Sequence, residues 1–293
     1  MANVAVIVSV DWEGRDLVPD SIDAMEAFRK RYPFIPMQQF LNAAYYTKPS
    51  ANPEQLTIDT RRTLLEDDIL GLHIHAWRSL FEAAGVEPKR EPNFREYGGP
   101  MRVVDGDWGH EIAIDAFTRD ELSRVIQTSI KILDEQGFGQ PTEFRSGAWL
   151  SGPSVIEALI DNGFRLDASA VNRRFIKRRW GTSPLYKRLS ELWDDISDTS
   201  QPYYQQSEEG RILQVPNNGC LADYTSPKDI LKVFEANLQE AKKNPAQTKY
   251  VSIGFHQETA NKFLPNIEKG IRLIMEKADK TGAKLSFVAS PFH

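Results

Sequence analysis

The segment VAVIVSVDWEG at residues 4–14 decides how the rest of this chain is interpreted. Its first seven residues are almost all apolar, most of them are β-branched, and they lead directly to Asp11 and Glu13. A short apolar run without alternation is typical of a parallel strand that is covered on both faces. The run lacks the basic leader of a secretory signal, so we interpret it as the first strand of a sheet and expect a cytoplasmic protein.

Similar apolar runs alternate with amphipathic segments along the chain. The clearest amphipathic segment, residues 119–136, places its aliphatic side chains on one helical face. Strand–helix alternation over the whole length predicts an α/β fold in which helices cover a parallel sheet, and seven or eight such units fit a distorted (β/α) barrel. We expect further strands at residues 34–41, 69–74, 142–144, 164–167, 212–215, 250–255 and 284–288, and further helices at 21–31, 54–67, 227–243 and 262–279, with another beginning at 152.

Length and composition limit the class of protein. The 293 residues are interpreted as a single domain over residues 1–293, and 36 Lys and Arg against 41 Asp and Glu give a net charge of −5. This balance argues against a general nucleic-acid-binding protein. The one cysteine, Cys220, excludes an internal disulfide framework. No stretch approaches the roughly 20 apolar residues of a transmembrane helix, and nothing indicates the oligomeric state.

Two segments interrupt the strand–helix alternation, at residues 78–118 and 170–211. Loops of this length in a compact domain are usually functional, and we expect both to cover the site. The second contains a basic run at residues 173–179, followed by Trp180. Such a run either contacts an anionic substrate or forms a solvated face.

Chemically reactive side chains gather where the expected strands end. The carboxyl ends of parallel strands build the active sites of barrels and open α/β sheets, so this shared position predicts one site. The side chains are Asp11, Glu13, His73, His75, Arg145, Trp149, Asp167, Asn217, Asn218 and His256.

His73 and His75 are separated by one residue, as are Asp11 and Glu13. Residues i and i+2 of an extended strand point to the same side, so each pair can converge on one pocket. Two imidazoles and one carboxylate supply the three protein ligands of a catalytic zinc site, which leaves the other carboxylate free to act as a base. Alternatively, the histidines simply end a strand and an acidic residue caps the next helix.

Three more residues are candidates for catalysis. Arg145 either holds a catalytic carboxylate ionised or forms a structural salt bridge. His256 ends an apolar strand beside the other candidates and is predicted to transfer protons. Asp167 either orients a catalytic histidine or caps a turn with Ser169.

Three residues have less specific interpretations. Trp149 either forms a sugar-stacking wall or belongs to the core. His110 lies on the first long segment, and we expect it to be solvated. His293 ends the chain and is expected to have no role. The chain also has no Gly-rich phosphate loop and no nucleophile-elbow serine.

Five short motifs, in order along nearly the whole chain, together resemble the polysaccharide deacetylase family, the NodB-homology carbohydrate esterases. This family has a distorted (β/α) barrel and uses a divalent metal, commonly zinc, to remove N- or O-acyl groups from sugars. The resemblance therefore implies a metal-dependent hydrolase with an acylated amino sugar or saccharide as its substrate. The motifs are VSVDWEG at 8–14, GLHIHAW at 71–77, FRSGAWL at 144–150, RLDASA at 165–170 and SIGFHQE at 252–258.

The resemblance also implies the roles in catalysis and metal binding, and we expect three further residues to contact the substrate. The catalytic set is Asp11 as base, Arg145 as its brace, His256 as general acid and Asp167 as the residue that tunes this histidine; the metal ligands are Glu13, His73 and His75; and the expected substrate contacts are Trp149, Trp77 and Asn217.

The chain departs from the family pattern at three points. Its acidic pair is Asp-x-Glu where the family has two adjacent aspartates, and its arginine motif lacks the usual proline. Its motif histidines stand two residues apart and not four, because position 77 is Trp. We therefore expect a divergent member. Two other functions remain possible: a catalytically silent carbohydrate-binding barrel and a barrel glycosidase.

Overall fold

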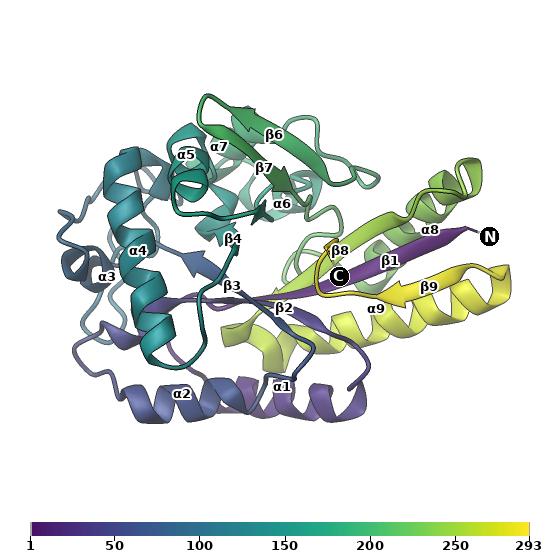
Figure 1. The fold of residues 1–293 in the computed structure, drawn as a ribbon, viewed down its shortest axis with the longest axis horizontal. Coiled ribbons are helices and arrows are strands. Elements are labelled where there is room, and N and C mark those ends of the chain that lie inside the picture. Colours follow the sequence, from purple (N-terminus) through teal and green to yellow (C-terminus); the bar gives the residue numbers. More distant parts are fainter. Residues whose placement is uncertain (1, 293) are drawn as a thin grey trace.

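Nine strands of the described chain form one curled sheet that is wrapped by helices (Figure 1). The structure is a computed structural model that describes residues 2–292, so Met1 and His293 lie outside it. The strand order is β6-β7-β5-β4-β3-β2-β1-β8, β9 pairs with β1, and every pairing is parallel except β6 with β7. The strands are β1 (Asn3–Asp11), β2 (Met37–Leu41), β3 (Ile69–Ile74), β4 (Glu143–Ser146), β5 (Leu166–Asp167), β6 (Tyr203–Ser207), β7 (Gly210–Gln214), β8 (Lys249–His256) and β9 (Lys284–Phe287).

The segment that follows β7, residues 217–222, joins the two sides of the curled sheet. The amide N–H of Gly219 donates to the carbonyl of Ser252 (2.9 Å), and that of Ala222 donates to the carbonyl of Gly254 (2.8 Å). The predicted distorted α/β barrel is therefore confirmed. Among the described residues, eight strands pair in parallel as expected, and the antiparallel strand β6, with the polar sequence YYQQS, is additional because no apolar run predicts it.

Strand β1 shows how alternation divides the side chains between the two faces of the sheet. Its four valines pack outward into the main core with the helices. Ile7 belongs to a separate small cluster with Phe40 inside the barrel. Ser9 and Asp11 continue this inner row, and both accept hydrogen bonds from Arg145 of β4. The inner row thus becomes polar toward the carboxyl end of the strand.

Helices cover the outer face of the sheet (Figure 1). Helices α8 and α9 pack on each other and on β8, α1 packs on α9, and α4 packs on α5. Among the described residues, no helix combines the length and the apolar character needed to cross a membrane. The helices are α1 (Pro19–Arg31), α2 (Pro53–Arg61), α3 (Arg78–Ala83), α4 (Arg119–Glu135), α5 (Pro153–Asp161), α6 (Arg174–Trp180), α7 (Pro184–Leu192), α8 (Pro227–Lys243) and α9 (Ala260–Thr281), with short 3₁₀ helices η1 (Ala43–Tyr46), η2 (Ile114–Ala116), η3 (Gly147–Trp149) and η4 (Gln257–Thr259).

The two segments expected to be long loops differ from each other. Residues 78–118 contain α3 and η2 and are otherwise irregular. Residues 170–211 contain α6, α7 and β6, so the expectation of a continuous loop is wrong there. Helix α7 does carry a start signal, with Ser183 as N-cap and Pro184 as its first residue.

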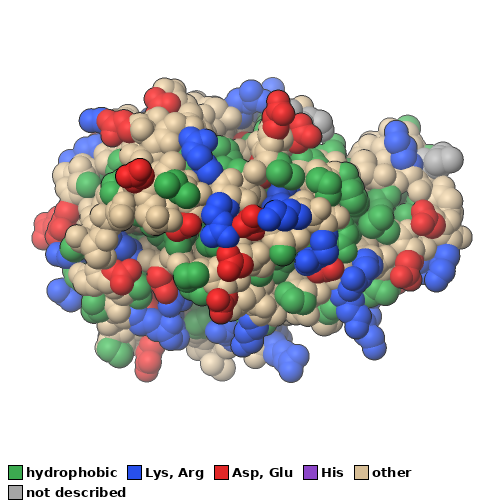
Figure 2. Space-filling model, turned by 90° about the horizontal axis from the view of Figure 1, so that it is seen from below, with side chains coloured by type: hydrophobic (Ala, Val, Ile, Leu, Met, Phe, Trp, Pro, Cys, Tyr) green, Lys and Arg blue, Asp and Glu red, His purple; other side chains and the backbone are tan. Residues whose placement is uncertain are grey.

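Charged side chains are mixed on the face of the molecule shown in Figure 2, where Lys and Arg are interspersed with Asp and Glu. No histidine is visible on this face. All four described histidines are buried or half-buried, and all four lie in one pocket.

Candidate active site

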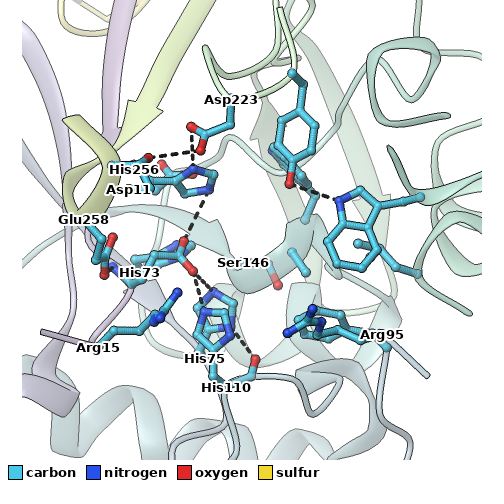
Figure 3. A pocket seen from close by; sticks show the side chains of 18 of the residues that line it. Asp11, Arg15, His73, His75, Arg95, His110, Ser146, Asp223, His256 and Glu258 are labelled. Atoms are coloured by element: carbon cyan, nitrogen blue, oxygen red, sulfur yellow. Dashed lines mark hydrogen bonds and ion pairs between the residues drawn. The ribbon is translucent and has the colours of Figure 1, made fainter. Parts of the chain in front are cut away.

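A pocket lies at the carboxyl ends of β1, β3 and β8, and segments 78–118 and 170–211 contribute to its walls (Figure 3). Its lining combines acidic groups, imidazoles, aromatic rings and guanidinium groups. The residues are Asp11, Glu13, Asp223 and Glu258; His73, His75, His110 and His256; Phe94, Trp149, Trp180 and Tyr224; Arg15, Arg95, Arg102 and Arg179; and Ser146, Ala148, Leu185 and Thr259.

The carboxylate of Glu13 lies at the centre of this pocket. The Nε2 atoms of four histidines surround it: His73 at 3.3 Å, His75 at 3.0 Å, His110 at 2.6 Å and His256 at 3.6 Å. Burial alone would raise the pKa of Glu13. The charges of His75 and His256, together with hydrogen bonds from His110 and His73, outweigh burial and hold this pKa well below its usual value.

Two of these histidines have their other ring nitrogen held by a backbone carbonyl. Nδ1 of His73 lies 2.8 Å from the carbonyl oxygen of Arg145, and Nδ1 of His75 lies 2.8 Å from that of His110. A carbonyl only accepts, so each Nδ1 carries a proton, and whenever the ring is neutral its lone pair is at Nε2. Lone pairs that face the Glu13 oxygens repel them unless a proton or a metal cation lies between.

The atoms around Glu13 suit a metal ion. Ligand atoms of Glu13, His73 and His75 lie within 4.8 Å of one another. Nε2 of His75 is buried and has no hydrogen-bond partner among the described residues. Two imidazoles with carbonyl-bonded Nδ1 atoms and one carboxylate are typical of a catalytic zinc site with its supporting hydrogen bonds. The shortened histidine spacing therefore still brings both imidazoles to one point.

Asp11 and Arg145 form an ion pair inside the barrel. Nη1 of Arg145 donates to Oδ1 of Asp11 (2.8 Å) and to Oγ of Ser9 (2.7 Å), and its Nε donates to the carbonyl of Ala168 (3.0 Å). The guanidinium also lies over the ring of Phe40, 4.6 Å from its centroid. With side chains 0% and 3% exposed, the pair is shielded from solvent, so Arg145 determines how the Asp11 carboxylate is oriented.

The register of the parallel strands places the reactive residues at one level of the barrel. Asp11 of β1 lies opposite His256 of β8, and His73 of β3 lies opposite Arg145 of β4. Backbone pairing alone therefore explains why residues more than 60 positions apart meet in this pocket.

His256 is paired with Asp223, so the expectation that Asp167 tunes this histidine is wrong. Nδ1 of His256 lies 2.9 Å from Oδ1 of Asp223, whose other oxygen accepts a hydrogen bond from Thr259 (3.0 Å). Burial would lower the pKa of His256, but the charges of Asp223 and Glu13 and the hydrogen bond to Asp223 raise it to about 10.

Asp167 lies outside the pocket lining and caps a turn. It accepts hydrogen bonds from both the amide N–H and the hydroxyl of Ser169, and from Nε2 of Gln214 (2.7 Å). Burial raises the pKa of Asp167, and these hydrogen bonds only partly oppose that effect. The turn-capping interpretation is therefore the one that the structure supports.

The sequence does not predict Asp223 as a site residue, because no strand is expected beside it. Leu221, on the segment 217–222, forms a parallel bridge with Gly254 of β8. Asp223 and His256 each lie two residues after this bridged pair, so the bridge brings them side by side. The pairing depends on how the barrel closes, which no local pattern predicts.

Trp77 and Asn217, expected to contact the substrate, do not line the pocket. Trp77 is fully buried, and its indole N–H donates to the carbonyl of Glu13 (2.8 Å). Asn217 is fully buried, and its amide donates to the carbonyl of Ser252 (3.1 Å) where the barrel closes. Both expectations are wrong, because both side chains support backbone near the site. Trp149 does line the pocket.

His110, which we expected to be solvated, belongs to the centre. Its ring stacks on that of His75, with centroids 4.0 Å apart and an interplanar angle of 13°. Burial and the charge of His75 lower the pKa of His110 to about 3 against the opposing effect of Glu13. Gly109 is the local signal: its φ is +111°, and a Cβ there would collide with the carbonyl of Ala76.

The turn after β4 is strained and reaches the histidine pair. Ala148 and Trp149 have φ of 53° and 58°, a conformation that L residues rarely adopt and that often occurs at functional sites. A Cβ on Gly147 would lie 2.7 Å from the ring of His75 and from the carbonyl of Ile74. Only glycine lets this turn bring Trp149 to the pocket beside His75.

No protein-family model matches the chain, and no curated protein matches its sequence. Solved structures do match. A protein assigned as a polysaccharide deacetylase from Mycobacterium smegmatis aligns over 98% of this chain and 88% of its own, at 11% identity and a TM-score of 0.54. One so assigned from Pseudomonas aeruginosa PAO1 aligns over 97% and 87%, at 13% identity and a TM-score of 0.52. PuuE allantoinase aligns over 97% and 86%, at 12% identity and a TM-score of 0.52.

At these identities the likeness concerns the fold. The chain has the fold of polysaccharide deacetylases, and the NodB-like resemblance carried by its motifs is confirmed at that level.

Replacing Asp11 by asparagine should destabilise the fold, because the substitution leaves the buried Arg145 charge without its counter-charge. We expect a loss of about 3 kcal/mol in the free energy of unfolding, measured by urea denaturation of metal-free protein. The control is Glu240→Gln, which breaks the exposed Lys243–Glu240 pair and should cost less than about 1 kcal/mol. Similar losses in both variants would contradict the role of the pair inside the barrel.

Proposed function

We propose that this protein is a metal-dependent hydrolase that removes an acyl group, such as acetyl or formyl, from the nitrogen or oxygen of a saccharide. One observation carries the proposal: Asp11 and His256, a base and an acid, lie opposite each other on adjacent strands beside the group formed by Glu13, His73 and His75. The fold shared with polysaccharide deacetylases agrees with it.

We infer that Glu13, His73 and His75 hold the metal ion. Two imidazoles and one carboxylate suit Zn²⁺. Nε2 of His75 lies 3.0 Å from Glu13 without forming a hydrogen bond, and a cation at this point would balance the ring lone pairs aimed at Glu13. When bound, the ion would polarise the acyl carbonyl and make a water molecule more acidic.

The proton transfers fall to Asp11 and His256. Asp11, oriented by Arg145, takes a proton from the water whose oxygen bonds to the acyl carbon. His256, held at Nδ1 by Asp223, gives the proton on Nε2 to the leaving nitrogen or oxygen as its bond to the acyl carbon breaks. The products are a carboxylic acid and a free amine or hydroxyl, so the atoms of one water molecule are accounted for.

The aromatic wall of the pocket supports a saccharide as the substrate. Trp149, Trp180 and Tyr224 line one region: the rings of Trp149 and Tyr224 lie 5.8 Å apart, and the indole N–H of Trp180 donates to the Tyr224 hydroxyl (3.3 Å). Flat rings combined with polar edges suit the apolar faces and hydroxyl groups of a sugar.

The two other functions fit less well. A glycosidase needs one carboxylic acid that is protonated and a second carboxylate across the scissile bond. Asp11 is paired with Arg145, and Glu13 is surrounded by four imidazoles, so neither suits the role of acid. The carboxyl group left for that role is Glu258, whose pKa burial and the charge of Glu13 raise to about 8, and product analysis distinguishes the two reactions. A silent binding barrel would not need both proton-transfer residues and the metal ligands to converge.

The test of the proposed function is hydrolysis by zinc-reconstituted protein. Assayed on neutral and anionic saccharides that carry N-acetyl or N-formyl groups, it should release acetate or formate and a free amine. Chelation should lower the rate at least 100-fold, and added zinc should restore it. Saccharides shortened without acid release would identify a glycosidase, and no product from any of these substrates would favour the silent barrel.

Metal content should depend on the histidine pair. Elemental analysis of reconstituted protein should find about one zinc ion per chain, and the His73→Ala/His75→Ala variant should lose it. The control is His256→Ala, which removes a neighbouring imidazole outside the proposed ligand set and should keep its zinc. Metal-free wild-type protein after reconstitution, or full zinc in the double variant, would contradict this ligand set.

Asp223 and Asp167 should differ sharply in their effect on turnover. Asp223→Asn removes the charge that holds His256 and should lower kcat about 100-fold with little change in KM. The matched Asp167→Asn variant should change kcat less than about fivefold, because Asp167 only caps a turn. Rates are measured per folded molecule, with folding checked by urea denaturation. A larger loss of kcat in Asp167→Asn than in Asp223→Asn would instead identify Asp167 as the residue that tunes His256.

A further inference from the structure

Four arginines line the pocket that holds the candidate metal centre: Arg15, Arg95, Arg102 and Arg179. They come from three segments that are distant in the sequence: the end of β1, segment 78–118 and α6. The whole chain carries a net charge of −5, so its composition does not explain this local excess of positive charge. The arrangement therefore needs an explanation at the site itself.

The guanidinium groups have few partners within the protein. Among the described residues, the side chains of Arg15 and Arg179 form no ion pair, and none of the four guanidinium groups donates a hydrogen bond. Each guanidinium carries five N–H donors in a planar arrangement that matches a carboxylate or a phosphate. The donors are thus available to a ligand that enters the pocket.

One buried acidic residue holds two of these arginines side by side. Glu111 is 1% exposed, and its Oε1 lies 3.6 Å from both Nη1 of Arg95 and Nε of Arg102. Burial and the positive charges of Arg95, Arg15 and Arg179 lower the pKa of Arg102, with Glu111 opposing them. The carboxylate of Glu111 is thus shared by Arg95 and Arg102, while the charge of Arg15 acts on the pocket carboxyl of Glu258.

One aromatic ring lies near two of the cations. The guanidinium carbons of Arg95 and Arg179 both lie 5.6 Å from the centroid of the Trp180 ring. Contact with an aromatic face restrains a guanidinium and leaves its edge free to donate. Of the basic run 173–179, Arg179 is the residue that lines the pocket, whereas Arg174 pairs with Asp198.

From these observations we propose that the substrate carries an anionic group, a carboxylate or a phosphate, that binds the cluster of Arg15, Arg95, Arg102 and Arg179. The sugar ring lies against Trp180, and the acyl group reaches the acidic centre around Glu13. The arginines attract the anionic group, whereas the acyl group is uncharged, so the two ends of the substrate differ in where charge draws them. The position of the acyl group rests on the proposed function, whereas the binding of the anion does not.

Binding of matched sugar pairs tests the proposal on the full chain. Isothermal titration calorimetry compares N-acetylglucosamine 1-phosphate with N-acetylglucosamine, and D-glucuronate with D-glucose. At least one anionic member should bind tenfold or more tightly than its neutral partner, and the preference should weaken in 0.5 M NaCl. The two pairs distinguish phosphate from carboxylate. Repeating the titrations on the His73→Ala/His75→Ala variant excludes binding of the anion to a metal ion.

The variant Arg102→Gln/Arg179→Gln should abolish most of this preference. It keeps Arg95 as the partner of Glu111, and both replaced side chains are exposed, so the fold should be retained. Losing two charge-assisted contacts should weaken anion binding at least tenfold and leave binding of the neutral sugar within about twofold. The control is Arg178→Gln, an exposed arginine of α6 outside the pocket lining, which should bind like the wild type.

Two results would overturn the proposal: equal or undetectable binding of both members of each pair, or a preference that survives in Arg102→Gln/Arg179→Gln. Hydrolysis is measured separately. Deacylation of neutral sugars without any anion preference would remove this inference and leave the proposed function. Anion binding that depends on the arginines, in a protein without hydrolytic activity, would support this inference and remove the proposed function.

Discussion

The ion pair between Arg145 and Asp11 is the interaction on which the rest of the site depends. The side chain of Arg145 orients the Asp11 carboxylate, and the backbone carbonyl of Arg145 fixes the tautomer of His73. One residue therefore positions a proton acceptor and a candidate metal ligand. Burying such a pair is seldom the most stable solution, since well-packed apolar residues often do as well or better. An ion pair with side chains at most 3% exposed is therefore better explained by chemistry than by stability.

The same reasoning applies to the centre of the pocket. Four imidazole nitrogens lie within 3.6 Å of the Glu13 carboxylate, and two of them present lone pairs when the rings are neutral. Protons or a metal cation must balance this arrangement. Because His73 and His75 are held at Nδ1 by backbone carbonyls, their Nε2 atoms are aimed at Glu13 whichever cation is present. The centre is thus pre-organised by main chain, and little rearrangement is needed to bind an ion.

Alternation along strands allowed much of this to be predicted from the sequence. Asp11 and His256 each end a strand and His73 is the last residue but one of β3, and parallel strands bring their carboxyl ends together whatever the loops do. Asp223 and His110 could not be found in this way. Asp223 reaches His256 only through the bridge that closes the barrel, and His110 reaches Glu13 only because a glycine lets a distant loop pass close to β3. Both depend on contacts between segments, which periodicity within a segment does not record.

The short spacing of the histidine motif has a structural consequence for the whole pocket. Trp77 stands where the resemblance places a second histidine, while His110 from segment 78–118 stacks on His75 and contacts Glu13. The same segment carries Arg95 and Arg102. A shift of this segment on binding an anion would move His110 relative to Glu13, because Arg95, Arg102 and His110 are carried by one stretch of chain whereas Glu13 follows β1. Binding of an anion and the state of the centre would then be linked through segment 78–118, which a pattern of strands and helices alone leaves unassigned.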